Sequence, residues 1–239
     1  MTSLLMRRAA MMRHRQETAL SYLCFTAVDA TAIAWSKVGT LTKGQAIEYS
    51  TDGVSWTAYT FGTPISLAVG EKCYFRGDNT SFSESPTVYL HFTSTGRVAA
   101  SGNMMSLVDK TCTQTSTTTS MFVHAFDGCT TLLSAPELPA TTLALNSYRY
   151  MFKGCTALTQ APYLPTSSST YNYTYGEMFS GCTNLSVIRV GLTVWRSSGQ
   201  RDWVKNVSPT GTFYCPSALD TSTPGVDRNP PGWTVINTD

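Results

Sequence analysis

Short hydrophobic runs separated by turn residues fill residues 20–108, and none of them has the spacing of an amphipathic helix. Apolar and polar positions alternate in several runs, as in strands that bury one face. Asp52-Gly53 and Thr95-Gly96 fall between runs, where glycine permits the positive φ of a tight hairpin. The pattern predicts a β-sandwich-like domain over residues 19–110, with strands at 20–28, 45–49, 55–61, 72–76, 87–92 and 97–101.

The segment 111–120 is rich in serine and threonine and offers almost nothing to bury. This composition is typical of an exposed connection rather than of a packed element. We therefore expect a Ser/Thr-rich linker here, between the sandwich-like domain and a second domain at 121–194.

Residues 121–194 contain three copies of the pattern Phe-x-Gly-Cys-Thr-x-Leu, which begin at Phe126, Phe152 and Phe179. Regular copies of this length indicate units that stack, because one unit alone cannot bury its apolar face. The pattern predicts a short solenoid with one strand and one short helix in each unit. Its buried rows are expected from Phe126, Cys129, Leu132, Phe152, Cys155, Leu158, Phe179, Cys182 and Leu185.

Prolines mark the extended part of each unit. Residues 135–139 read Ala-Pro-Glu-Leu-Pro and residues 161–165 read Ala-Pro-Tyr-Leu-Pro. Because proline has no N–H to donate, we expect loose hydrogen bonding there. The third unit has Ile188-Arg189 in place of Ala-Pro, so the array is predicted to end and to be closed by a C-terminal cap at 195–239.

Composition and charge argue against several classes of function. Charged residues make up 13% of the chain and the formal net charge is +2, so no overall electrostatic attraction to nucleic acid or to a membrane surface is predicted. The seven cysteines are an odd number without a Cys-x-x-Cys pair. Neither a zinc site nor a complete disulfide framework is expected, and no cofactor is predicted.

Candidates for catalysis are few. Of the three histidines, only His124 lies near other reactive groups, Asp127 and Cys129, and the equivalent cysteines of the other units have no such histidine. No phosphate-binding loop, dinucleotide fingerprint, catalytic-serine motif or zinc-protease motif occurs. The sequence predicts that the chain is not an enzyme, while a pair of carboxylates of the glycosidase kind stays open at this point.

The N-terminal arm, residues 1–18, combines arginines with leucines and methionines, and its first 16 residues contain no acidic residue. We expect it to anchor the protein on a larger assembly, through apolar burial and through arginine pairing with carboxylates. The residues assigned to this anchor are Leu4, Leu5, Met6, Arg7, Arg8, Met11, Met12, Arg13 and Arg15. The alternative is a secretory signal peptide over residues 1–32, cleaved after Ala32. No apolar run is long enough to span a membrane.

Tyrosines around the end of the second unit suggest contact with sugars. Tyr163, Tyr171 and Tyr173 lie beside the polar stretch 167–170. Exposed aromatic rings offer flat apolar faces with a polar handle, so the three are candidates for carbohydrate contact. Packing in the core is the competing interpretation for part of this group.

The pattern Tyr-x-x-Met-Phe-x-Gly-Cys-Thr-x-Leu-x-x-Ala-Pro-x-Leu-Pro of residues 148–165 resembles the BspA-like leucine-rich repeats of gut bacterial surface proteins and of the phages that infect those bacteria. Residues 206–235 are similar to the C-terminal closure of that family, and residues 49–56 and 94–107 to the domain before its repeats. The resemblance implies adhesion or surface display and transfers no binding residue. The arginine- and methionine-rich start is more similar to phage-encoded members.

The function expected from these features is that of a structural phage protein in the virion, such as a fibre, decoration or tail-associated subunit. Its arm would bind other virion proteins, and its repeats would contact host-surface or mucus carbohydrate. A homo-oligomer is expected because particle appendages are usually symmetric, and no nucleic acid partner is expected. The alternative is a secreted adhesin at a bacterial cell surface, with residues 1–32 as its signal peptide.

Overall fold

The computed structural model describes residues 21–167, 172–196 and 198–239. Within those ranges the protein is mainly β, as predicted, with three sheets, none of them closed, and one short 3₁₀ helix, η1 (Met104–Leu107). The strands are β1 (Leu23–Ala27), β2 (Thr31–Val38), β3 (Glu48–Ser50), β4 (Thr57–Ala58), β5 (Ile65–Leu67), β6 (Lys72–Arg76), β7 (Tyr89–Ser94), β8 (Val98–Ser101), β9 (Leu132–Ser134), β10 (Val187–Arg189), β11 (Thr212–Cys215) and β12 (Thr234–Asn237).

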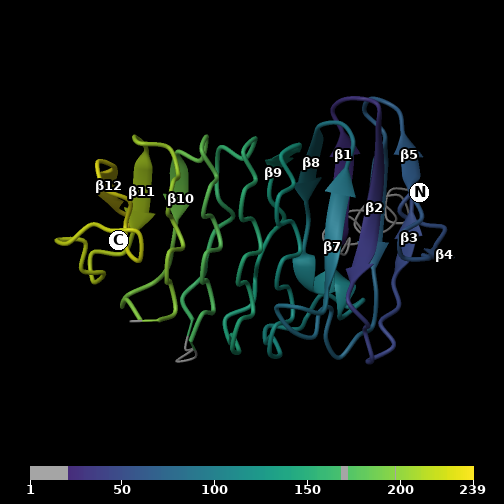
Figure 1. The fold of residues 1–239 in the computed structure, drawn as a ribbon, viewed down its shortest axis with the longest axis horizontal. Helices are drawn as coiled ribbons and strands as arrows, with labels where there is room; N and C mark the ends of the chain where they lie inside the picture. Colours follow the sequence, from purple (N-terminus) through teal and green to yellow (C-terminus); the bar gives the residue numbers. More distant parts are fainter. Residues whose placement is uncertain (1–20, 168–171, 197) are drawn as a thin grey trace, which may run out of the picture.

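Two sheets lie in the N-terminal part (Figure 1). They share an aromatic core. One has the order β4-β3-β6-β1-β8-β9 and the other the order β5-β2-β7. Their neighbouring strands are antiparallel except β8 and β9. Phe25 of β1 stacks on Phe92 of β7 with ring centroids 4.0 Å apart, so the two sheets meet through these rings. Trp35 of β2 is fully buried beside them.

Three details of the strand prediction are wrong, and the first is that it contains no strand at β5. The sequence pattern misses β2, although Thr31, Ile33 and Trp35 alternate inward along it and it lies between β5 and β7. In the predicted strand 55–61, only the two residues of β4 pair. The reason lies in Asp52, whose carboxylate accepts the N–H groups of the next turn residues and extends that turn into the predicted strand.

The stretches predicted as short helices are chains of turns instead. Ser120, His124 and Gly128, four residues apart, have φ values of 59°, 56° and 71°. The same spacing recurs at Asn146, Tyr150 and Gly154, and at Tyr173, Glu177 and Gly181. A right-handed helix requires negative φ throughout, so it cannot pass through these positions. The helix in each unit was therefore wrongly predicted.

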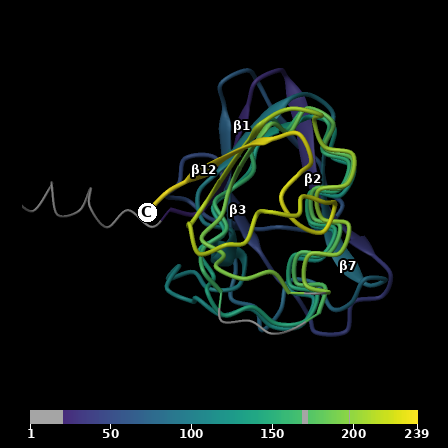
Figure 2. The same ribbon diagram turned by 90° about the vertical axis from the view of Figure 1, so that its left-hand side faces the viewer.

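Backbone hydrogen bonds join the turn side of each unit to the next. In the first unit every second N–H crosses to the second unit, and the N–H groups between them bond within their own unit. The crossing donor–acceptor pairs are Phe122–Ser147, His124–Arg149, Phe126–Met151 and Gly128–Lys153, at 2.9, 3.1, 2.8 and 2.6 Å. Figure 2 looks along the long axis and shows the turn sides of successive units lying over one another.

Side chains of successive units form rows inside the stack. The rings of Phe126 and Phe152 are 5.3 Å apart and nearly parallel, and those of Phe152 and Phe179 are 5.7 Å apart. A second row contains Phe122, Tyr148 and Tyr175. All nine residues assigned to the buried rows from the sequence are buried in the structure.

The cysteines of the units are free thiols that serve as hydrogen-bond donors. The Cys155 thiol donates to the carbonyl of Phe126 at 3.0 Å, and the Cys182 thiol donates to that of Phe152 at 2.9 Å. Burial raises the pKa of Cys182 to about 12 and that of Cys155 well above its ordinary value. Both therefore stay protonated at neutral pH and stabilise the stack as small buried donors.

The region predicted as a cap begins with residues that continue the pattern of left-handed positions and turn-side hydrogen bonds. Asp202 and Asn206, four residues apart, have φ values of 51° and 58°. Gly181 of the third unit donates its N–H to Lys205 at 2.8 Å, as the glycines before it do to their next units. Asn206 thus takes the place of glycine, which asparagine does more readily than other residues. The parallel strands β10, β11 and β12 lie at this end of the chain.

One hydrophobic core continues from the N-terminal sheets into the units. Phe126 connects the two, because its ring centroid lies 5.6 Å from Trp35, 5.6 Å from Phe92 and 5.3 Å from Phe152. β9, which belongs to the first unit, also extends the six-stranded sheet by pairing with β8.

The predicted linker 111–120 is ordered by polar contacts at both ends. Its second half packs on the units, since Thr117 is buried and its hydroxyl lies 2.6 Å from that of Ser147. Its first half is held by the carboxylate of Asp109, which accepts backbone N–H groups from Thr111, Thr113 and Gln114. The domain boundary at this segment stays a prediction, and the core is continuous across it.

Candidate functional site

The sheet side of the stack is interrupted between the first two units. Residues 135–139 bond toward the N-terminal part, where the Glu137 N–H donates to Gly102 at 2.7 Å. Residues 161–165 bond the other way, and the Leu164 N–H donates to the last residue of β10 at 3.1 Å. Within the described ranges no backbone hydrogen bond joins these two segments, although the turn sides of the same two units are bonded throughout.

Prolines account for the interruption. Each of the two segments carries two of them, Pro136 and Pro139 in the first, Pro162 and Pro165 in the second. A proline nitrogen has no hydrogen to donate, so a continuous ladder cannot form across these walls. The sequence pattern predicts loose hydrogen bonding at these segments, and in the described structure the two walls share no backbone hydrogen bond.

A groove lies where the ladder is missing. Its larger hollow has a volume of about 450 Å³ and is lined by the two proline-bearing segments, with Glu137 and Tyr163 among the lining residues. A second hollow of about 380 Å³ shares Ala135, Pro162 and Tyr163 with the first and adds Ser134, Thr159 and Gln160. Together they form an apolar half and a polar half that meet at Tyr163, and we call this feature the groove.

Tyr163 is the most exposed aromatic residue of the groove, with 57% of its surface accessible. Its hydroxyl lies against the next unit, because a Cβ placed on Gly191 would be 2.6 Å from the hydroxyl oxygen. The backbone at Gly191 is in turn held by the Thr166 hydroxyl, which donates to its carbonyl at 2.6 Å. The polar end of the Tyr163 side chain therefore lies close to Gly191, and the residue lines both hollows.

The lining of the groove carries little charge. Among the described residues that line the two hollows, the carboxylate of Glu137 is the only charged group. Arg189 at the end of β10, whose carbonyl accepts from the Leu164 N–H, stacks on Tyr214 with its guanidinium carbon 3.9 Å from the ring centroid. Its charge is thus engaged with the following strand.

Of the other two tyrosines predicted to contact sugar, the structure describes only Tyr173, which is not among the lining residues of the groove. Tyr171 lies outside the described residues. Tyr173 belongs to the turn side, where Arg149 lies 4.6 Å from its ring centroid and Arg201 donates to its hydroxyl at 3.4 Å. Its ring is therefore engaged by two guanidinium groups and is only half-exposed.

The turn side carries a polar aromatic row that includes the catalytic candidate of the sequence. His124 is stacked between Tyr89 and Tyr150, each 4.4 Å away, and its Nδ1 lies 2.6 Å from the carboxylate of Asp127. The thiol of Cys129 contacts Ser94 and Thr131 and has no contact with His124 in the described structure. The three groups thus do not form a nucleophile with its base.

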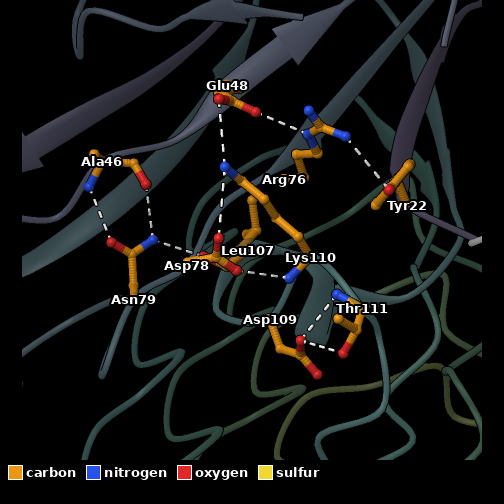
Figure 3. Close-up of polar contacts among 10 residues, drawn as sticks. All are labelled: Tyr22, Ala46, Glu48, Arg76, Asp78, Asn79, Leu107, Asp109, Lys110 and Thr111. Atoms are coloured by element: carbon orange, nitrogen blue, oxygen red, sulfur yellow. Dashed lines mark hydrogen bonds and ion pairs between the residues drawn. The ribbon is translucent and has the colours of Figure 1, made fainter. Parts of the chain in front are cut away.

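A second polar cluster lies near the point where the described chain begins (Figure 3). Glu48 accepts from Arg76 at 2.8 Å, and Lys110 lies 3.3 Å from Glu48 and 3.5 Å from Asp78. The Arg76 hydrogen bond holds the pKa of Glu48 below its ordinary value, despite partial desolvation. Arg76 also donates to the hydroxyl of Tyr22. These opposite charges neutralise one another and connect β3, β6 and the loop after η1.

Every residue assigned to the N-terminal anchor lies outside the described residues, from Leu4 to Arg15. In the described ranges, histidine, cysteine, aspartate and glutamate side chains do not gather in groups of three or more that could hold a metal ion. No helix of the described structure has the length and apolar character needed to cross a membrane.

Comparison of the chain with family models, with curated proteins and with solved structures finds no match. The groove and its contacts are therefore the basis for a functional assignment.

Proposed function

We propose that the chain is a structural, non-enzymatic subunit of a phage virion, anchored by residues 1–18, whose repeat units contact carbohydrate on the host surface or in mucus. The groove carries the carbohydrate part of this proposal, because it joins an exposed aromatic ring, prolines and polar side chains in two adjoining hollows. Sites for small ligands combine a mainly apolar lining with a few polar groups in this way. The groove is equally compatible with a fibre, a decoration protein and a tail-associated subunit.

The fold that belongs to this proposal is a short BspA-like leucine-rich-repeat solenoid. Three observations support it: the motif phenylalanines stack in register, the left-handed residues recur every fourth position, and the units bond through their turn sides. A solenoid presents one side of each unit as a continuous surface, which suits contact with a polymer. A homo-oligomer remains part of the proposal because it would repeat the groove.

The alternative is a secreted bacterial adhesin whose residues 1–32 are removed. One observation weighs against that cleavage site. Strand β1 (Leu23–Ala27) lies between β6 and β8 in the six-stranded sheet, and Phe25 is fully buried there. Cleavage after Ala32 would remove this strand and expose the core beneath it, at a cost of several kcal/mol.

The location separates the two proposals. Phage particles and host envelope are resolved on a density gradient, and each fraction is searched by mass spectrometry for the protein and its N-terminal peptide. We expect the protein in particles with residues 1–16 intact. Deleting those residues should abolish incorporation while the remaining chain still folds, as judged by circular dichroism. Recovery from the envelope with a start near residues 31–33 would contradict the virion proposal and support the adhesin.

A further inference from the structure

The charge and the shape of the groove narrow the class of carbohydrate that it can hold. We propose that the groove binds an uncharged polysaccharide of hexose rings, an inference that rests on the proposed carbohydrate contact. One sugar ring would lie with its C–H face on the apolar half, against Tyr163, and with its hydroxyl edge toward the polar half. Glu137 would be the residue that excludes acidic sugars.

The exclusion of acidic sugars follows from the charges at the groove. Uronic, sialic and sulfated sugars carry anionic groups that proteins usually meet with arginine or lysine. The lining residues of the two hollows include neither, and their one charge is the carboxylate of Glu137. The Arg189 guanidinium stacks on Tyr214 instead. An anionic sugar in the apolar half would therefore lose its hydration and meet a like charge.

The preference for a sugar over a peptide follows from the walls. A proline-rich peptide also docks on aromatic grooves, but its carbonyl groups need donors from the walls. The four prolines of the walls have no N–H, and the Tyr163 hydroxyl lies against Gly191 in the next unit. A sugar ring needs fewer such donors on its C–H face. Its hydroxyl groups would find Thr159 and Gln160 in the adjoining hollow, where the Ser134 hydroxyl already donates to the carbonyl of Ala100 at 2.7 Å.

The side chain of Glu137 is free to be exchanged without disturbing the sheet. Its residue contributes backbone groups to the fold, the N–H that donates to Gly102 and the carbonyl that accepts from Met104. The residue itself is exposed. Glu137→Gln and Glu137→Lys thus change the charge of the groove while they leave its walls in place.

Affinity electrophoresis of the full chain tests this assignment. The gels contain mannan or mixed-linkage β-glucan as uncharged hexose polymers, and polygalacturonate or alginate as uronate polymers. We expect retardation by at least one uncharged polymer and none by the uronates. Tyr163→Ala should weaken the uncharged interaction about tenfold, the scale of one lost aromatic contact. Tyr173→Ala, the matched control on the turn side, should bind as the wild type does.

The Glu137 variants test the proposed class of sugar independently of the proposed carbohydrate binding. Both variants should gain retardation by a uronate polymer, and Glu137→Lys should gain more than Glu137→Gln, because the first reverses the like charge that the second only removes. The sugar class is overturned if the wild type binds a uronate polymer, or a polyproline peptide, more tightly than any uncharged polymer. The carbohydrate function itself fails if no polymer of either kind retards the wild type, or if Tyr163→Ala binds as tightly. Thermal melts of each variant confirm that the fold persists.

Discussion

The ring of Phe126 is the place where the stability of the N-terminal sheets and that of the units depend on the same side chain. We consider its replacement by leucine, which nearly conserves volume but removes the ring. The matched control is Phe179→Leu, which makes the same change farther along the same row. Both side chains are fully buried, so exposure does not distinguish them.

The difference between the two variants follows from their ring contacts. Phe126 lies within 6.1 Å of four rings, those of Phe25, Trp35, Phe92 and Phe152. Phe179 has two such neighbours, Phe152 and Trp203. An aromatic pair contributes about 0.5–1.5 kcal/mol beyond the area it buries, so two further pairs make Phe126→Leu roughly 1–3 kcal/mol more destabilising. The change of shape adds up to about 1.5 kcal/mol to both variants.

Urea denaturation followed by circular dichroism and by tryptophan fluorescence measures these free energies of unfolding. Trp35 reports on the N-terminal sheets and Trp203 on the units, so the two parts are observed together. Because the core is continuous, we expect one transition in both variants, with the larger loss for Phe126→Leu. An equal or smaller loss than for Phe179→Leu would refute the contact argument. A second transition in the wild type would refute the single cooperative core.

Two other predictions concern acid stability and the turns. Desolvation raises the pKa of Glu84, but hydrogen bonds from residues 42–45 outweigh it and lower that pKa from 4.5 to about 2. The stabilising effect of the Glu84 carboxylate is complete above pH 4.5 and is lost as the pH falls toward 2. The melting temperature of the wild type should therefore fall more steeply over this pH range than that of Glu84→Gln. Parallel curves of melting temperature against pH, measured by calorimetry, would contradict this. Gly154 has a φ of 70°, so Gly154→Ala should lower the free energy of unfolding by about 1–2 kcal/mol. Gly154→Asn should lower it less, since Asn206 has a similar positive φ four residues after Asp202. Equal urea midpoints for the two variants would argue against backbone strain.

The row positions of the units were predictable because the sequence period maps directly onto the stack. Phe152, Cys155 and Leu158 recur at fixed spacing, and fixed spacing in stacked units means one shared interior. The helix was wrongly predicted because left-handed residues such as His124 and Tyr150 are not glycine and give no sign of positive φ in the sequence. The left-handed positions at Asp202 and Asn206 carry no such sequence signal, because Asn206 stands where the other units have glycine and no Cys-Thr follows it.

The groove was predictable only in its parts. The prolines indicated weak hydrogen bonding, and Tyr163 was among the candidate sugar contacts. The location of the break depends on which neighbour each wall bonds to, and these partners, Gly102 and the end of β10, are distant in sequence. Tyr173 was misplaced beside Tyr163 because the sequence does not reveal the two arginines that engage its ring on the turn side.

The two sides of the stack together explain why the groove does not close. Two extended segments without hydrogen bonds between them would normally move together or apart. Here every second N–H on the turn side joins the same two units, and the rings of Phe126 and Phe152 stack 5.3 Å apart. The spacing of the walls is thus set from outside the groove, and a ligand need not break strand hydrogen bonds to enter. Such a preformed site loses little conformational entropy on binding. It follows that Phe126→Leu, which loosens that spacing without lining the groove, should weaken polysaccharide binding as well as the fold.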